Sequence, residues 1–183
     1  MAKQFSALED DHRAFIEASH LFFVASAAPT GRVNMSPKGM DSLRVLGPNR
    51  IAWLNLTGSG NETAGHLLQA NRITLMWIGL ERRPLILRAY GSARVVHERD
   101  ADWGEMVELF GNPLGARQVF DVDIDLVQTS CGFGVPFFDY AGERDTLKHW
   151  AKDRGPDGIR SYWDERNRTT IDGAPTGIIE PDE

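Results

Sequence analysis

The feature of this sequence that most constrains its fold is a series of short strand-like segments separated only by tight turns. Two pairs of such segments come first, 21–28 with 33–38 and 42–46 with 50–56, and Pro29-Thr30-Gly31 is the turn of the first pair. β-branched and aromatic residues favour strands, whereas Gly, Pro and Asn mark the turns between them. Consecutive strands with short links predict an antiparallel sheet or barrel and not a doubly wound fold.

The rest of the chain carries further strand signals and a few helical ones. In 121–129 aspartates alternate with Val, Ile and Leu, a period of two that gives the strand one wet face and one buried face. Strands are also expected at 72–80 and 85–97, and helices at 7–20, from a glycine-rich loop to about Ala70, and at 101–110, 144–152 and 158–167. The Gly/Pro-punctuated segment 131–136 predicts a loop, and the Pro/Gly-rich end predicts a docked or frayed tail.

Composition narrows the class of protein. A chain of 183 residues with 42% hydrophobic and 25% charged residues suits one globular domain. The formal net charge of -6 gives no overall support for nucleic-acid binding. The apolar stretches are too short to span a membrane, and the N-terminus lacks the apolar core of a signal peptide. The single cysteine, Cys131, excludes an intrachain disulfide, so the expected location is cytoplasmic.

The glycine-rich loop 57–63 is the sharpest chemical signal. Glycines let a backbone approach an anion, and the N-terminus of the helix that follows presents free N–H groups and a partial positive charge. Hydroxyl and amide side chains could add donors, which predicts a phosphate cradle of Thr57, Ser59, Asn61 and Thr63. The alternative is purely structural: Ser59 and Glu62 have the spacing of a capping box. The loop matches neither a Walker A motif nor the dinucleotide fingerprint.

Two cations could reach a bound anion. Lys38 follows Pro37 in a short strand, and a proline is unfavourable at a sheet centre, so this strand is expected at an edge or a bulge. The alternative is an edge lysine that prevents aggregation. Arg88 interrupts the apolar run 85–90, and a buried arginine needs an anionic partner, either a cofactor phosphate or a protein carboxylate.

Other site chemistries find little support. The five histidines are scattered without an H-x-x-x-H pattern, so no metal site is expected. There is no G-x-S-x-G elbow typical of hydrolases. Cys131 is a conceivable nucleophile, but a lone cysteine more often serves as a small buried residue. No catalytic side chain is assigned.

The motif Ser36-Pro37-Lys38-Gly39, the segment 53–63 and the segment 71–77 stand in an order that resembles the pyridoxamine 5'-phosphate oxidase-like, FMN-binding split-barrel family. The resemblance covers about residues 10–130, and 130–136 is similar to a subgroup of that family. It implies a mainly β fold, a six-stranded antiparallel split barrel with flanking helices, in a homodimer with FMN at the subunit interface. Residues 1–140 would form the barrel, and 141–183 a helical extension and tail packed on the same domain.

The resemblance also implies which residues bind the cofactor. The matching positions for FMN phosphate are Ser36, Lys38, Thr57, Ser59, Asn61 and Thr63, with Arg88 as a weaker candidate. Where the family has a Ser-Arg-Lys run this chain has Asn61-Glu62-Thr63, so two positive charges are lost and one negative charge is gained. Lys38 and Arg88 would have to compensate. The Arg-rich C-terminal segment of the family is not recognisable, which argues against pyridoxamine phosphate as the substrate.

The function expected from this pattern is an FMN-dependent oxidoreductase with a small-molecule substrate and no nucleic-acid or membrane partner. Two alternatives stay open: a noncatalytic barrel that binds or senses flavin or haem, and a reader of deazaflavin F420. A homodimer would cover apolar surface such as Trp53 and Trp77. The segment 131–140, which mixes glycines and phenylalanines, is expected either to line the cofactor or substrate pocket or to serve as a packed linker.

Overall fold

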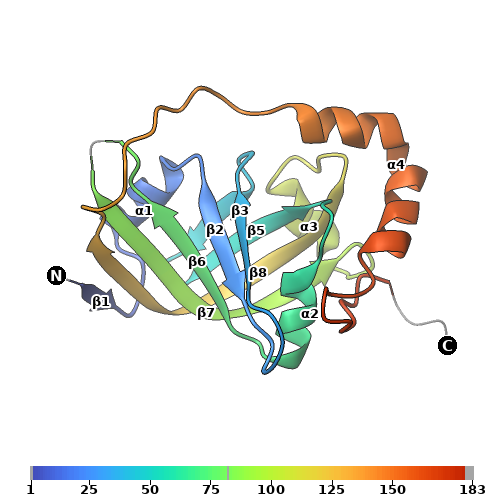
Figure 1. The fold of residues 1–183 in the computed structure, drawn as a ribbon, viewed down its shortest axis with the longest axis horizontal. Coiled ribbons are helices and arrows are strands. Elements are labelled where there is room, and N and C mark those ends of the chain that lie inside the picture. Colours follow the sequence, from blue (N-terminus) through green and yellow to red (C-terminus); the bar gives the residue numbers. More distant parts are fainter. Residues whose placement is uncertain (1, 82, 180–183) are drawn as a thin grey trace.

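The fold is a single antiparallel sheet that curls into a barrel without closing (Figure 1). A computed structural model describes residues 2–81 and 83–179. In chain order its elements are β1 (Lys3–Phe5), α1 (Asp10–Glu17), β2 (Phe22–Ser26), β3 (Asn34–Lys38), β4 (Leu43–Gly47), β5 (Arg50–Leu56), α2 (Glu62–Gln69), β6 (Ile73–Ile78), β7 (Leu85–His97), α3 (Trp103–Glu108), β8 (Ala116–Cys131) and α4 (Thr146–Arg166).

The sheet order is β3-β2-β6-β7-β8-β5-β4, with β1 paired to β8. Strands β3 and β4 are the two edges, so the barrel is split between them. The mainly β, antiparallel class with flanking helices is therefore confirmed. The sheet has eight strands where the family resemblance implied six: all seven strand segments expected from the sequence form, and the short β1 adds another.

The interior of the barrel is filled with aromatic rings. Trp53 stacks on Phe120 with their centroids 4.5 Å apart, and Trp77 stacks on Phe22 at 6.1 Å. Both indoles are only 1% exposed. The expectation that Trp53 and Trp77 form a surface for a partner is therefore wrong, because both lie on the inward faces of their strands.

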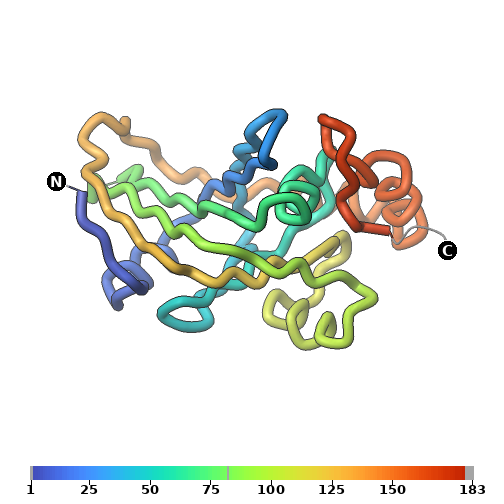
Figure 2. Tube along the Cα trace, turned by 90° about the horizontal axis from the view of Figure 1, so that it is seen from below, coloured from blue at the N-terminus to red at the C-terminus, as the bar shows by residue number. Residues whose placement is uncertain are grey.

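The chain after β8 wraps around the barrel. Segment 132–145 crosses over one end and leads into α4, which bends at Gly155 (φ 65°) beside Pro156, so the two expected helices form one bent element (Figure 1). The segment after α4 then folds back beside α2 (Figure 2). Gly65 of α2 permits this approach, because a Cβ there would overlap Thr170 of the tail. Among the described residues, no helix is long and apolar enough to cross a bilayer.

Candidate anion site

A cavity of about 330 Å³ lies at the split, between edge strand β3, strand β5 and the loop that leads into α2. It brings together five of the residues proposed from the sequence: Ser36, Lys38, Ser59, Asn61 and Thr63. They come from two segments of the chain, 36–38 and 59–63, and the curl of the sheet brings these two segments together. We call this space the anion cavity.

Strand β3 supplies one wall of the anion cavity. Asn34, Ser36 and Lys38 pair with Ser26, Val24 and Phe22 of β2, so their side chains share the inward face of the sheet. The edge position expected from Pro37 is confirmed, since β3 has a partner on one side only. An edge strand can carry this inward polar row because the split leaves no third strand to pack against it.

Lys38 is the first cation of the cavity. Its Nζ lies 5.2 Å from the centroid of the Trp53 ring, a cation–π distance. Burial, and secondarily the nearby positive charge of Arg117, lowers the pKa of Lys38 to about 8. No described carboxylate lies within ion-pair distance of this ammonium group. Its charge is therefore available to a ligand.

Arg117, the second cation, was missed by sequence reasoning. The pairing of β5 with β8 shifts so that Asn55 faces Gln118 and Leu56 faces Ala116, which leaves Arg117 as the extra residue of a bulge. A bulge re-aims a side chain, and here it turns the guanidinium into the anion cavity. The alternating pattern was recognised only from Asp121 onward, because 117–120 are all buried. The one available signal was a charged residue inside that run.

The hydrogen bonds of the Arg117 guanidinium in the described part of the chain all go to neutral acceptors. Its Nη1 donates to Asn167 Oδ1 at 2.7 Å and to Gly58 O at 3.4 Å. The side chain is 2% exposed, and burial lowers its pKa to about 10. Its Nε is buried without a hydrogen-bond partner. Buried charge normally carries an ionic partner, so this arrangement is what an anion-binding cavity requires.

The helix start differs from the expectation. The capping box between Ser59 and Glu62 is not formed: Asn61 is the N-cap residue of α2, and its side chain makes no capping bond. Glu62 instead accepts the backbone N–H of Ile171 at 3.0 Å. The carboxylate that seemed to oppose phosphate binding is thus engaged by the tail, and it is the sole acidic side chain among the described residues that line the cavity.

Further unpaired donors surround the cavity. Asn61 Nδ2 and Trp53 Nε1 are buried, and neither has a hydrogen-bond partner in the described structure. Together with Arg117 Nε they are donors on residues that line one small space. A buried donor left unpaired costs about 1–3 kcal/mol. A ligand with several acceptor oxygens, such as a phosphate monoester, would satisfy such a set.

Two of the proposed residues lie outside the cavity lining. Thr57 is buried, and its hydroxyl donates to Gly115 O and accepts from Trp163 Nε1, both at 2.9 Å. Arg88, on β7, donates to Ser130 Oγ at 3.3 Å. Thr63 does line the cavity, but its hydroxyl also accepts from Ser26 Oγ at 3.2 Å.

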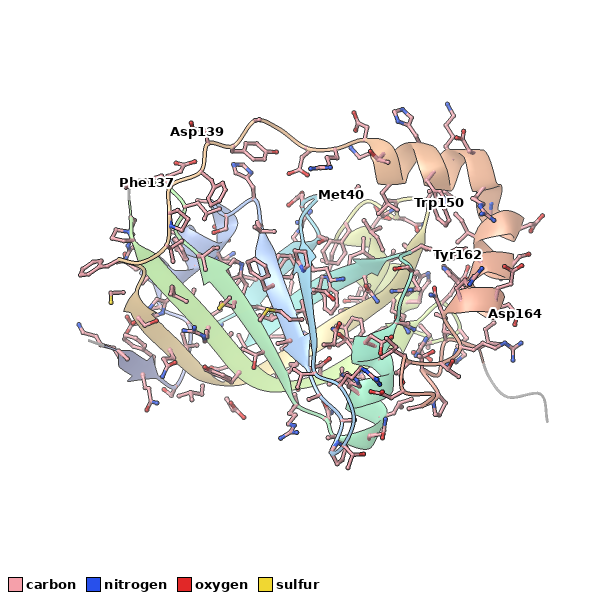
Figure 3. All side chains as sticks on the ribbon, viewed as in Figure 1. Met40, Phe137, Asp139, Trp150, Tyr162 and Asp164 are labelled. Atoms are coloured by element: carbon pink, nitrogen blue, oxygen red, sulfur yellow. The ribbon has the colours of Figure 1, made fainter. Side chains whose placement is uncertain are left out.

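The segment 131–140 does not line the anion cavity. Phe133 and Phe137 are each 82% exposed, and Cys131 is exposed rather than a small buried residue. Figure 3 shows Phe137 and Asp139 on the opposite side of the barrel from Tyr162 and Asp164 of α4. Tyr140 lines a second cavity, of about 600 Å³, where its ring stacks on His20 at 3.7 Å. The described residues contain no cluster of three His, Cys, Asp or Glu side chains that could hold a metal ion.

Known proteins resemble this chain in sequence and in fold. A family profile described as pyridoxamine 5'-phosphate oxidase matches residues 8–131. The pyridoxamine 5'-phosphate oxidase family protein ustO of Aspergillus flavus is 38% identical over 147 residues, which are 78% of this chain. The chain covers 59% of the length of that relative.

Solved structures share the fold at low sequence identity. A putative pyridoxamine 5'-phosphate oxidase from Lactobacillus delbrueckii matches with a TM-score of 0.54 and 17% identity, over 67% of this chain and 94% of its own. HutZ, a haem storage protein from Vibrio cholerae, matches with a TM-score of 0.51 and 16% identity, over 69% of this chain and 97% of its own. The profile match over residues 8–131, seen together with this split sheet, shows that the chain belongs to the pyridoxamine 5'-phosphate oxidase family.

Proposed function

We propose that this protein is an FMN-binding flavoprotein, an oxidoreductase for a small molecule, and that the anion cavity takes the FMN phosphate. The observation that carries this proposal is the meeting of Lys38 and Arg117 in one cavity whose sole described acidic side chain, Glu62, is already hydrogen-bonded elsewhere. A phosphate monoester carries about 1.5–2 negative charges at neutral pH. That charge matches two cations that have no carboxylate partner among the described residues.

The energetics favour a ligand of this charge. Burial disfavours the charged forms of both side chains, as their lowered pKa values show. A bound dianion would offset that penalty and accept the free donors of Asn61 and Arg117. Ser36 and Ser59 add hydroxyl groups to the lining.

Bound FMN would supply hydride or electron transfer, while the chain binds and orients the flavin and excludes water. Binding and orienting the flavin require no acid or base among the cavity side chains. Lys38, Arg117 and the loop hold the phosphate end, and the aromatic interior behind Trp53 keeps water out. We further propose that residues 1–140 form this cofactor-binding unit and that 141–183 are an extension packed on it.

A homodimer is part of the proposal. Met35, on the outward face of edge strand β3, is 62% exposed, and Val33 just before it is 74% exposed. These apolar side chains lie on or just before the strand that forms one wall of the anion cavity, and a second copy could cover them and close over the flavin. Light scattering of the flavin-loaded protein should give the mass of a dimer, and a monomer at micromolar concentration would contradict this part.

Haem and F420 remain the competing ligands. Haem iron needs an axial side chain, and no histidine is among the described residues lining the anion cavity. F420 also carries a phosphate group, so the cavity alone does not separate it from FMN. We propose FMN because the monoester dianion matches the two cations better than the single charge of a phosphodiester.

The test begins with the absorption spectrum of the purified protein, which distinguishes flavin, deazaflavin and haem. The apoprotein is then titrated with FMN and with riboflavin, which lacks the phosphate. We expect FMN to bind at least tenfold more tightly, the effect of about one charge-assisted hydrogen bond. Equal affinities would overturn the assignment of the anion cavity to the phosphate. Oxidation of a reduced nicotinamide by the loaded protein would then separate an enzyme from a sensor.

A further inference from the structure

The chain beyond β8 contributes directly to the anion cavity. The family match ends at residue 131, yet three later residues form hydrogen bonds to residues 57–62 of the glycine-rich loop, which we call the phosphate loop. Trp163 Nε1 donates to Thr57 Oγ1 at 2.9 Å, Asn167 Nδ2 donates to Gly58 O at 3.1 Å, and the Ile171 N–H donates to Glu62 at 3.0 Å. The loop is thus held along its length by the C-terminal extension.

Asn167 is the centre of these contacts. It is the C-cap residue of α4, is 0% exposed, and its backbone carbonyl accepts a bond from Thr176 Oγ1. Its side-chain amide uses both ends: Oδ1 accepts from Arg117 Nη1 at 2.7 Å, and Nδ2 donates to Gly58 O. One side chain therefore fixes the cation of the cavity and the backbone of the loop relative to each other.

The neutrality of Asn167 matters for the charge of the cavity. A carboxylate at the same position would form an ion pair with Arg117 and cancel much of the attraction for a ligand anion. An amide oxygen orients the guanidinium and leaves its positive charge uncompensated. The same logic applies to Gly58 O, the other acceptor of Arg117.

We propose that Asn167 is a positioning residue that sets the preference for phosphorylated over unphosphorylated flavin, acting through Arg117 and the loop 57–62. This inference rests on the proposed function, since it assumes that the cavity holds the flavin phosphate. It assigns cofactor selectivity to a residue outside the matched family segment. The competing interpretation is that Asn167 only fastens α4 to the barrel.

The decisive variant is Asn167→Asp in the full chain, because it is nearly isosteric and adds one negative charge beside Arg117. The readout is the ratio of FMN to riboflavin affinity in titrations of the apoprotein. We expect the ratio to fall at least tenfold while riboflavin binding changes little. A second readout is the rise in melting temperature that inorganic phosphate gives the apoprotein, which should shrink in the variant.

Asn49→Asp is the matched control. Asn49 also ties two backbone segments together, since its Nδ2 donates to Ser6 O at 2.7 Å and Ile124 O at 2.9 Å, but it does not line the anion cavity. The variant Asn49→Asp should lower the melting temperature and leave the ratio of FMN to riboflavin affinity unchanged. A wild-type ratio kept by Asn167→Asp would overturn the positioning role.

Trp163→Phe serves if Asn167→Asp does not fold. It removes one donor to the loop and keeps an aromatic ring, so the ratio should fall by a smaller factor, about twofold to tenfold. An unchanged ratio in this variant would equally overturn the inference. If instead the wild-type protein shows no preference for FMN over riboflavin, the proposed function fails before any variant is measured.

Discussion

The two sides of this barrel are built in opposite ways. On the closed side, β6, β7, β8 and β5 pair continuously, and residues such as Leu75, Leu87 and Phe120 are fully buried. On the split side, where edge strand β3, the end of β5 and the loop before α2 line the anion cavity, the inward positions of β3 are polar and several donors have no partner in the described structure. The closed side satisfies its own groups, whereas the split side satisfies them only with a ligand. Stability and binding are thus carried by different walls of the same sheet.

The largest effect should come from the closed side. Leu87→Ala removes a fully buried side chain of β7 that does not line the anion cavity, and it should lower the free energy of unfolding by about 2–5 kcal/mol. Urea denaturation measures this loss. At temperatures where the variant stays folded, its FMN to riboflavin ratio should match the wild type. A loss of FMN affinity without a loss of riboflavin affinity would show that packing on the closed side also determines binding on the split side.

Arg117→Met tests the split side. FMN affinity should fall by about 1.5–3 kcal/mol, roughly tenfold to a hundredfold, because a charge-assisted bond is lost. Stability should change little, because removing a buried charge that has no ionic partner is favourable, whereas leaving Asn167 Oδ1 unpaired costs about 1–3 kcal/mol. Titration and urea denaturation on the same sample report both. A large loss of stability with unchanged FMN affinity would mean that Arg117 stabilises the fold and does not bind FMN.

Lys38→Ala should weaken FMN by about 1.5–3 kcal/mol, nearer the lower end because this side chain is only half-buried. Riboflavin affinity should barely change, since the contact proposed is to the phosphate. The fold should survive, because an edge-strand lysine adds little to the core. Equal losses for both ligands in the titrations would mean that Lys38 contacts the ring system instead.

The pH dependence should have opposite signs for binding and for stability. The pKa of Lys38 is lowered by burial from 10.5 to about 8 in the ligand-free protein, so FMN affinity should fall as pH rises above about 8. The loss is at most about tenfold per pH unit. Between about pH 8 and 10.5 the unfolded chain holds the proton and the folded one does not, so this group makes the ligand-free protein more stable as pH rises. Between about pH 8 and 10, below the pKa of about 10 of Arg117, the loss of FMN affinity should be absent in Lys38→Ala.

Arg88→Met should have the smallest effect. Arg88 lies outside the lining of the anion cavity and bonds to Ser130, so FMN affinity should stay within about 0.5 kcal/mol of wild type. This variant is also the matched control for Arg117→Met, because both remove an arginine from a central strand. A tenfold loss of FMN affinity in Arg88→Met would mean that β7 contributes to the binding site.

Sequence reasoning succeeded where local signals act alone. Strands 50–56 and 85–97 were expected with the bounds of β5 and β7, and the edge position of Lys38 followed from Pro37. The short β1 was missed because three residues show no period, and its pairing with β8 is a tertiary contact. Terminal residues of the helices differ by a few positions, as caps and tertiary packing decide them.

The candidate site was only partly predictable for a similar reason. A hydroxyl-rich loop and a lysine can be read from the chain, but a bulge that re-aims Arg117 depends on how β8 pairs with β5. Glu62 looked like half of a capping box, yet its partner is Ile171, far along the chain. The burial of Trp53 and Trp77 was likewise missed, since alternation alone does not say which face of a strand is inside.

The bonds from the extension to the phosphate loop also set an order of assembly. Trp163 and Asn167 reach Thr57 and Gly58 across 106 and 109 residues of sequence. Contacts of such separation close late, because the entropy of a long loop must be lost before they form. During synthesis the barrel strands emerge first, and the phosphate loop lacks its bonds to Trp163 and Asn167 until α4 has been made. Cofactor capture should therefore be a late step of maturation, and a nascent chain halted before residue 163 would carry the cations of the site without the bonds that aim them.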